Sequence, residues 1–162
     1  MAVAAAVGLA LDQATKQLAV THLDPARPPE FFGGLLRLKL IRNPGAAFSM
    51  GENSTLAISV LALVAAVAML LVVAPRLRTV GQGLLAGMAT AGIVGNLVDR
   101  LVRPPGPMRG HVVDFFQVPH FAIFNVADIF ITCTALVMVV AAFRADPDEA
   151  DPDEAVPEEE SA

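Results

Sequence analysis

The chain has 162 residues, of which 55% are hydrophobic, and its mean hydropathy is +0.61. This is too apolar for an ordinary soluble domain of that length, so we expect one compact membrane domain, residues 1–145. The net charge of -5 is misleading, because nine of the sixteen acidic residues fall within residues 146–162. That segment is acidic, contains proline and lacks aromatic residues, which predicts a disordered acidic tail. The sequence has no basic surface interleaved with aromatic residues, so nothing in it indicates nucleic-acid binding.

The first apolar stretch, at about residues 2–20, is predicted to be a retained helix. No basic residue precedes it and polar residues interrupt it, which argues against a signal peptide. It carries Asp12 and Lys16, whose spacing of four allows them to pair along one helix face. The connection that follows contains Leu36-Arg37-Leu38-Lys39-Leu40. Its strict alternation predicts a half-buried strand, which we place in a small sheet at the membrane surface.

Three further apolar stretches follow, at about residues 56–74, 82–102 and 121–143. A spanning helix needs roughly 20 mostly apolar residues, and only helices or closed barrels satisfy the backbone in lipid. We therefore predict four transmembrane helices. The third carries Gly83, Gly87, Ala91 and Gly95 at four-residue spacing, which predicts close helix packing. A connection broken by prolines lies between the third and fourth helices and carries Asp114.

Three acids, Asp12, Asp99 and Asp128, lie within the apolar stretches. Burying a charge at such a position costs roughly 2.5–3.5 kcal/mol on insertion scales, so these residues are candidates for function. If four helices alternate in direction, all three acids reach the same side of the membrane, where the two long connections also emerge. Those connections bring Asn43 and Asp114 to the same side.

Two of the helices share a local pattern, in which Asn96 precedes Asp99 by three residues and Asn125 precedes Asp128 likewise. On one helix face an amide can orient a carboxyl group by hydrogen bonding. Two close carboxyl groups cannot both ionise easily, so one accepts a proton from water while the other donates to a carbonyl, as in aspartic proteases. A proton or cation pathway and a polar clamp between helices remain alternatives. The sequence has no HExxH, Walker or GxSxG motif, and we expect neither a metal nor a cofactor.

Five short motifs occur in a recognisable order along the chain. They are Asp12-Gln-Ala-Thr-Lys16, Asn43-Pro-Gly45-Ala-Ala-Phe48, Gly95-Asn96-Leu-Val-Asp99-Arg100, Val112-Val-Asp114-Phe115 and Phe124-Asn125-Val-Ala127-Asp128. In these residues the chain resembles the bacterial lipoprotein signal peptidases (signal peptidase II). The resemblance implies an all-α membrane protein with four transmembrane helices. A small β-sheet is expected on its extracytoplasmic surface.

The resemblance also implies an activity and a division of roles. Such enzymes remove the signal peptide of diacylglyceryl-modified prolipoproteins, cleaving just before the lipidated cysteine, with two aspartates and no metal. The matching motifs make Asp114 and Asp128 the catalytic pair. The supporting or substrate-binding positions implied by the same motifs are Asp12, Lys16, Asn43, Gly45, Asn96, Asp99, Arg100, Asn125 and Ala127. Globomycin-type cyclic peptides are expected inhibitors, and membrane lipid is an expected partner.

The resemblance places both termini in the cytoplasm and the site near the extracytoplasmic face of the bacterial cytoplasmic (inner) membrane. The distribution of basic residues points the other way, because cytoplasmic loops normally carry the excess of Lys and Arg. Three basic residues fall on the inferred inner side, and six on the outer: Arg27, Arg37, Lys39, Arg42, Arg103 and Arg109. We expect some of the outer cations to contact lipid or substrate.

Overall fold

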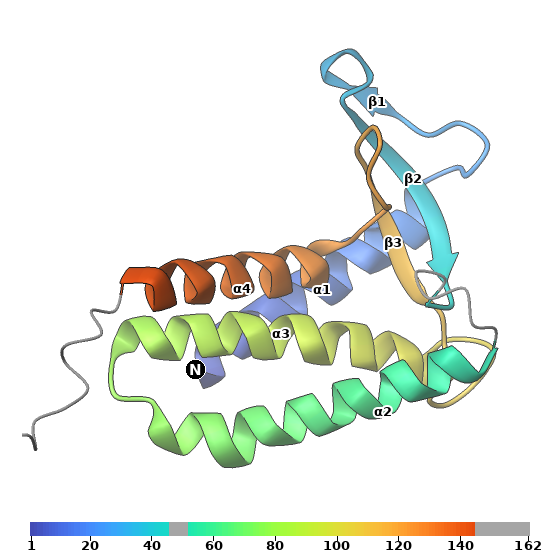
Figure 1. Ribbon diagram of the computed structural model, residues 1–162. Coiled ribbons are helices and arrows are strands. Elements are labelled where there is room, and N and C mark those ends of the chain that lie inside the picture. The colour runs from blue at the N-terminus through green and yellow to red at the C-terminus, as the bar shows by residue number, and fades with distance from the viewer. Residues whose placement is uncertain (46–51, 145–162) are drawn as a thin grey trace, which may run out of the picture.

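The computed structural model describes residues 1–45 and 52–144, and its largest part is a bundle of four helices (Figure 1). These are α1 (Ala2–His22), α2 (Glu52–Ala68), α3 (Val80–Val102) and α4 (Val126–Arg144). α2 continues through a π-helical segment, η3 (Met69–Val73), into a 3-10 turn, η4 (Ala74–Arg76). The predicted tail, 146–162, and the end of the motif that starts at Asn43 lie outside the described residues.

α3 is the central helix and packs against α1, α2 and α4. Its small residues allow the close approach: a Cβ on Gly87 would lie 2.6 Å from the Cβ of Ala4, and one on Gly95 would lie 2.5 Å from a carboxylate oxygen of Asp12. The close packing predicted from the glycine spacing is therefore confirmed. Successive helices alternate in direction, so the N-terminus, the α2–α3 link and the end of α4 lie at one end of the bundle (Figure 1).

The distribution of polarity in the bundle is inverted relative to a soluble protein. The side chains of Asp12, Lys16 and Asp99 are completely buried, whereas Leu61 and Leu71 are 67% and 71% exposed. An apolar exterior around a charged interior is what a helix bundle in lipid requires. Among the described residues, three helices are long and apolar enough to cross a membrane: Thr55–Arg76, Val80–Val102 and Val126–Arg144. α1 forms as predicted, but its role as a fourth span stays a prediction.

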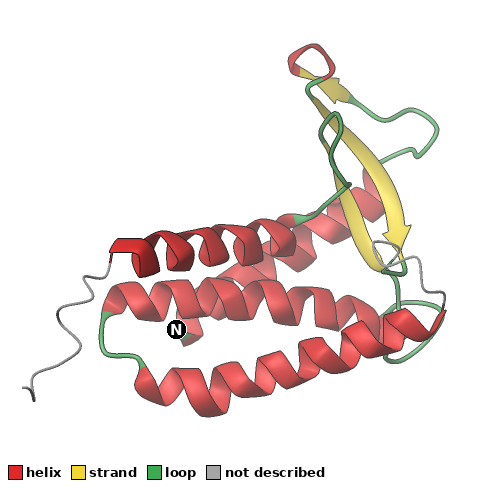
Figure 2. Ribbon diagram, viewed as in Figure 1, coloured by secondary structure: helices red, strands yellow, loops and turns green. Residues whose placement is uncertain are grey.

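A three-stranded antiparallel sheet lies at the other end of the bundle (Figure 2). Its order is β1 (Glu30–Phe31), β2 (Leu36–Asn43) and β3 (Val112–Gln117). The predicted strand is confirmed in β2, which extends three residues beyond the alternating segment. A β-bulge between Leu38 and Ile41 shifts the register of β2 against β3.

Two predicted boundaries were wrong, and both concern the catalytic candidates. Asp114 was expected in an irregular connection but lies within β3, a strand whose first four residues are all buried. Burial on both faces removes the alternation that would have predicted this strand. The fourth helix was expected to begin at residue 121 but begins at Val126. The backbone of Phe124 exchanges hydrogen bonds with that of Phe116, which holds the preceding segment extended.

Candidate active site

Asp128 lies in the first turn of α4, where it takes part in a reciprocal cap. The backbone N–H of Asn125 donates to Asp128 Oδ2 at 3.0 Å, and the backbone N–H of Asp128 donates to Asn125 Oδ1 at 3.1 Å. Such a capping box fixes the helix start and the orientation of both side chains. Asn96 Nδ2, from α3, donates to the other carboxylate oxygen at 2.8 Å. The helix N-terminus also favours negative charge at this position.

Asp114 is held from two sides by amide groups. Asn43 Nδ2, at the end of β2, donates to Asp114 Oδ2 at 2.8 Å, and Asn125 Nδ2 donates to Oδ1 at 2.6 Å. The amide of Asn43 is itself oriented, because its Oδ1 accepts from the backbone N–H of Gly45 at 2.8 Å. Gly45 has a φ of +101°, a conformation that side chains with a Cβ rarely adopt. The sequence-predicted Asn43 and Gly45 therefore act together on one carboxylate.

Asn125 connects the two carboxylates. Its side-chain amide donates to Asp114, while its backbone N–H donates to Asp128. The same amide nitrogen also donates to Asn96 Oδ1 at 3.1 Å. Two aspartates that are 14 positions apart in the sequence are thus joined through a single buried residue, and each of their four oxygens accepts one hydrogen bond from an amide.

The electrostatics of the site push Asp114 toward its neutral form. Burial raises the pKa of Asp114 from its usual 3.8 to about 6, and the negative charge of Asp128 adds to the rise. The hydrogen bonds from Asn43 and Asn125 and the charge of Lys16 act in the opposite direction. A shifted carboxyl group beside a second carboxyl group is typical of acid–base sites, although ion-pair networks shift pKa values as well.

Asp12 and Asp99 have partners of a different kind. Lys16 Nζ lies 3.0 Å from a carboxylate oxygen of each, and it also donates to Asn96 Oδ1 at 2.9 Å. Asp99 further pairs with Arg103 and accepts from the backbone N–H of Val113 at 3.1 Å. The predicted pairing of Asp12 with Lys16 is confirmed. Asp99, which the motifs make a supporting position, belongs to this ion-pair cluster, and its supporting role stays a prediction.

The cluster anchors three elements to one another. Asp12 Oδ1 accepts from the backbone N–H of Ala127 at 2.9 Å, which ties α1 to the start of α4. Gln13 donates both to Asp12 and to the carbonyl of Gly95 on α3, at 3.0 Å in each case. Gln13 lies inside the first of the five motifs but was not among the predicted site residues. Arg103 was missed as a partner of Asp99, although the two are four residues apart, the spacing that had identified Asp12 and Lys16.

Arg100 is buried within electrostatic reach of Asp114, Asp99 and Asp128. Among the described residues, its Nη1 has no hydrogen-bond partner. An unpaired donor on a buried guanidinium is costly unless a ligand satisfies it. The position of Arg100 is therefore suited to a substrate group that carries an oxygen.

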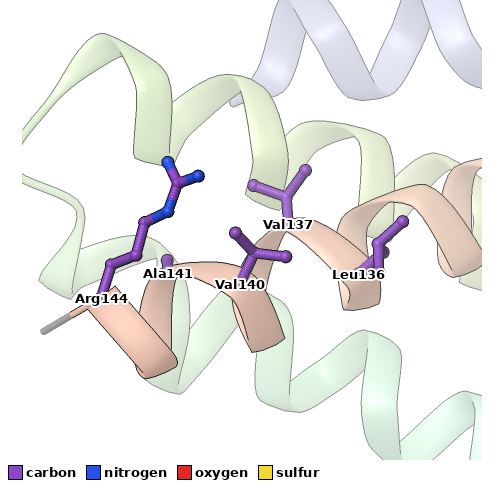
Figure 3. Close-up of a pocket in the computed structure, with 5 residues that line it drawn as sticks. All are labelled: Leu136, Val137, Val140, Ala141 and Arg144. Atoms are coloured by element: carbon purple, nitrogen blue, oxygen red, sulfur yellow. The ribbon is translucent and has the colours of Figure 1, made fainter.

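A pocket of about 590 Å³ lies elsewhere, toward the C-terminal end of α4. Figure 3 shows its lining along one helix: Leu136, Val137, Val140, Ala141 and Arg144. It is at the far end of α4 from Asp128 and offers no carboxyl or amide side chain, so it is not a candidate for the chemistry. Within residues 1–45 and 52–144, no group of three or more His, Cys, Asp or Glu side chains is arranged to hold a metal ion.

Comparison with known proteins gives consistent results over most of the chain. A family model described as signal peptidase (SPase) II matches residues 4–144. A lipoprotein signal peptidase of Rhodococcus jostii is 45% identical over 138 residues, covering 85% of this chain and 69% of the relative. One of Streptomyces coelicolor is 40% identical over 139 residues, covering 85% and 68%. A solved bacterial membrane enzyme shares the fold with a TM-score of 0.76 at 22% identity, covering 89% of this chain and 92% of that one.

Proposed function

The chain belongs to the signal peptidase II family, membrane proteases that process prolipoproteins, and we propose that it works as an aspartic endopeptidase. Its substrate would be a diacylglyceryl-modified prolipoprotein, cleaved just before the lipidated cysteine. The observation that carries the aspartic mechanism is the double contact of Asn125, which joins the carboxyl groups of Asp114 and Asp128. Two carboxyl groups held in this way can divide the roles of acid and base.

In the proposed mechanism the two aspartates share one proton. Asp114 holds it, because burial raises the pKa of that group, and donates a hydrogen bond to the carbonyl oxygen of the scissile peptide. Ionised Asp128 accepts a proton from a water molecule, whose oxygen attacks the carbonyl carbon. The tetrahedral intermediate then collapses, and the proton taken up by Asp128 passes to the leaving nitrogen. The reaction needs no covalent enzyme intermediate.

The surrounding side chains have roles that match their contacts. Asn43 and Asn96 each hold one carboxylate in a fixed orientation. Arg100 offers its Nη1, which has no hydrogen-bond partner within residues 1–45 and 52–144, to a backbone carbonyl of the substrate or to a phosphate of lipid. Globomycin-type cyclic peptides would inhibit by occupying the space between the two aspartates.

We propose that the chain spans the bacterial cytoplasmic membrane, as the family resemblance implies, and the bundle supports a multi-span arrangement. Three helices of the described part of the chain are apolar enough to span, and α1 packs alongside α3 in the same direction, so we assign α1 as the fourth span. With both termini cytoplasmic, the sheet and the aspartates lie near the extracytoplasmic face. There the lipid anchor of a substrate can remain in the bilayer while its peptide reaches the site. Residues 1–145 would form one peptidase domain and residues 146–162 a cytoplasmic tail.

The test is cleavage of a diacylglyceryl-modified precursor by the purified full chain. Asp114→Asn and Asp128→Asn are each expected to abolish cleavage, whereas Glu30→Gln, which removes an exposed carboxylate on β1, is expected to retain it. Full activity in either aspartate variant would refute the proposed pair. Loss of activity on adding a chelator would instead argue for a metal-dependent reaction.

A further inference from the structure

The hairpin of β1 and β2 projects away from the rest of the molecule. Figures 1 and 2 show that the two strands run across the direction of the helices and extend sideways past α4, with β1 outermost. Only the inner part of the hairpin, near Asn43, approaches the candidate active site. In a chain whose helices cross a bilayer, an arm of this kind lies over the lipid that surrounds the bundle.

One face of this hairpin carries a row of exposed cations, Arg37, Lys39 and Arg42. Residues directly opposite in an antiparallel pair share a face, and Arg37 and Arg42 lie opposite Gln117 and Val113. The β-bulge is what keeps Arg42 on the face of Arg37, because a spacing of five residues would otherwise place them on opposite faces.

At its inner end, this face of the sheet packs against the helix bundle. Val113 is completely buried there, in a cluster with Phe115 and with Ala19 of α1. The cations therefore begin where the sheet leaves the flank of α1 and continue outward beyond it.

The tip of the hairpin is apolar. Phe32 is 81% exposed and Leu35 is 60% exposed. Positive φ angles at Phe32, Gly33 and Gly34 fix a tight turn that presents these side chains outward. Aromatic and aliphatic side chains next to basic ones are typical of segments that lie in the interface of a membrane.

The basic residues at this end of the bundle differ in whether they have ion-pair partners. Of the basic residues that the sequence places at this end of the bundle, Arg103 pairs with Asp99, and Arg109 also has a partner. Arg37 pairs with Glu30 at 3.0 Å, but both side chains are about half exposed, so this pair is easily screened. Neither Lys39 nor Arg42 has an ion-pair partner among residues 1–45 and 52–144. The same holds for the exposed Arg27, so among the described residues at this end of the bundle the exposed positive charge without an ion-pair partner lies on the hairpin and on the connection that leads into it.

We propose that this cationic face, Arg37, Lys39 and Arg42, with the apolar tip formed by Phe32 and Leu35, docks on the bilayer by binding the phosphate groups of anionic phospholipids. The cations meet the headgroups while the tip enters the interface. Such a contact explains why an excess of basic residues lies at the sheet end of the bundle, opposite to the usual rule. An acidic peptide is a poorer fit, because the row leads away from the candidate active site and ends in an apolar tip.

The experiment uses the full chain in nanodiscs of phosphatidylcholine, alone or mixed with phosphatidylglycerol. The chain contains no tryptophan, so Phe32→Trp introduces a single fluorophore at the tip. Lipids brominated in the acyl chain quench tryptophan that reaches the interface. We expect phosphatidylglycerol to shift the emission to the blue and to increase quenching. Each cation near an anionic surface changes docking by about fivefold, so Lys39→Gln with Arg42→Gln should weaken it about 25-fold.

The matched control is Arg76→Gln with Arg78→Gln, which removes the same charge at the opposite end of the bundle and should leave the signal unchanged. Emission that is the same in both lipid compositions overturns the proposal, as does quenching that survives the loss of Lys39 and Arg42. A blue shift caused only by an added acidic peptide would assign the surface to a peptide instead. No cleavage is measured, so the result is separate from the proposed peptidase activity.

Discussion

Replacing Asp114 by asparagine should make the protein inactive and, at neutral to alkaline pH, more stable. In the folded protein, burial raises the pKa of Asp114 from 3.8 to about 6. The folded state therefore binds this proton more tightly than the unfolded state does. The stabilisation from the proton is fully present below about pH 4 and is lost as the pH rises through about 6.

The size of the effect follows from the shift. A difference of about 2.2 pKa units at 1.36 kcal/mol each gives about 3 kcal/mol of stability lost by pH 8, and Asp114 is only 2% exposed, so little is discounted for solvent. An asparagine at position 114 does not ionise, so the variant does not lose this stability as the pH rises. However, its NH2 group must face one of the two amides that now donate to Asp114, which costs about 1 kcal/mol. The variant should therefore be about 2 kcal/mol more stable at pH 8 and about 1 kcal/mol less stable below pH 4.

The assay is thermal unfolding of the detergent-solubilised full chain, measured across that pH range. For a chain of this length, 2 kcal/mol corresponds to an increase of about 4–8 °C in Tm. Asp24→Asn is the matched control, since it removes the same charge from an exposed site. The decisive feature is the reversal of rank between wild type and Asp114→Asn. If the stability difference keeps the same sign and size from acid to alkaline pH, the argument that Asp114 carries a buried charge at alkaline pH is refuted.

Three further perturbations test the site and its support. Asn43→Ala removes a hydrogen bond that lowers the pKa of Asp114, so the pH–rate profile of cleavage should show the ionisation of that group moving above 6. Gly95→Ala places a Cβ 2.5 Å from a carboxylate oxygen of α1 and should reduce the yield of folded protein, whereas Gly81→Ala, with its nearest atom at 3.9 Å, should not. Lys16→Met leaves two buried carboxylates without their shared cation and should cost about 3–5 kcal/mol, seen as a lower Tm.

The sequence was most informative where composition dictates the structure. Apolar length predicted helices within a few residues of those observed, and small residues at Gly87 and Gly95 predicted the face on which α3 packs. Alternation of direction predicted that acids distant in sequence would gather, and the contacts of Lys16 with Asp12 and Asp99 bear this out. These features depend on local pattern and on the bilayer, so one sequence is enough to derive them.

The sequence was less informative where tertiary contacts override local pattern. The strand β3 is buried on both faces and has no alternation to detect, so Asp114 was placed in a connection. Apolar length alone could not show that the segment before Asn125 is held by pairing with Phe116 rather than by helical hydrogen bonds. The cap formed by Asn125 and Asp128 has the spacing of a helix N-terminus, but the apolar run before it concealed that signal.

The buried acids of the described site fall into two groups according to their partners, and this separation gives a physical reason for dividing their roles. Asp12 and Asp99 each form an ion pair with the ammonium of Lys16, and these contacts tie α1 to α3. Asp114 and Asp128 accept hydrogen bonds from side-chain amides and a backbone N–H, which orient a carboxyl group without adding a full charge. A carboxyl group that must gain and lose a proton in each cycle needs a fixed orientation, and amide donors supply it without forming an ion pair. Lys16 serves both groups, because it neutralises the first and, through Asn96 Oδ1, fixes the amide that donates to Asp128.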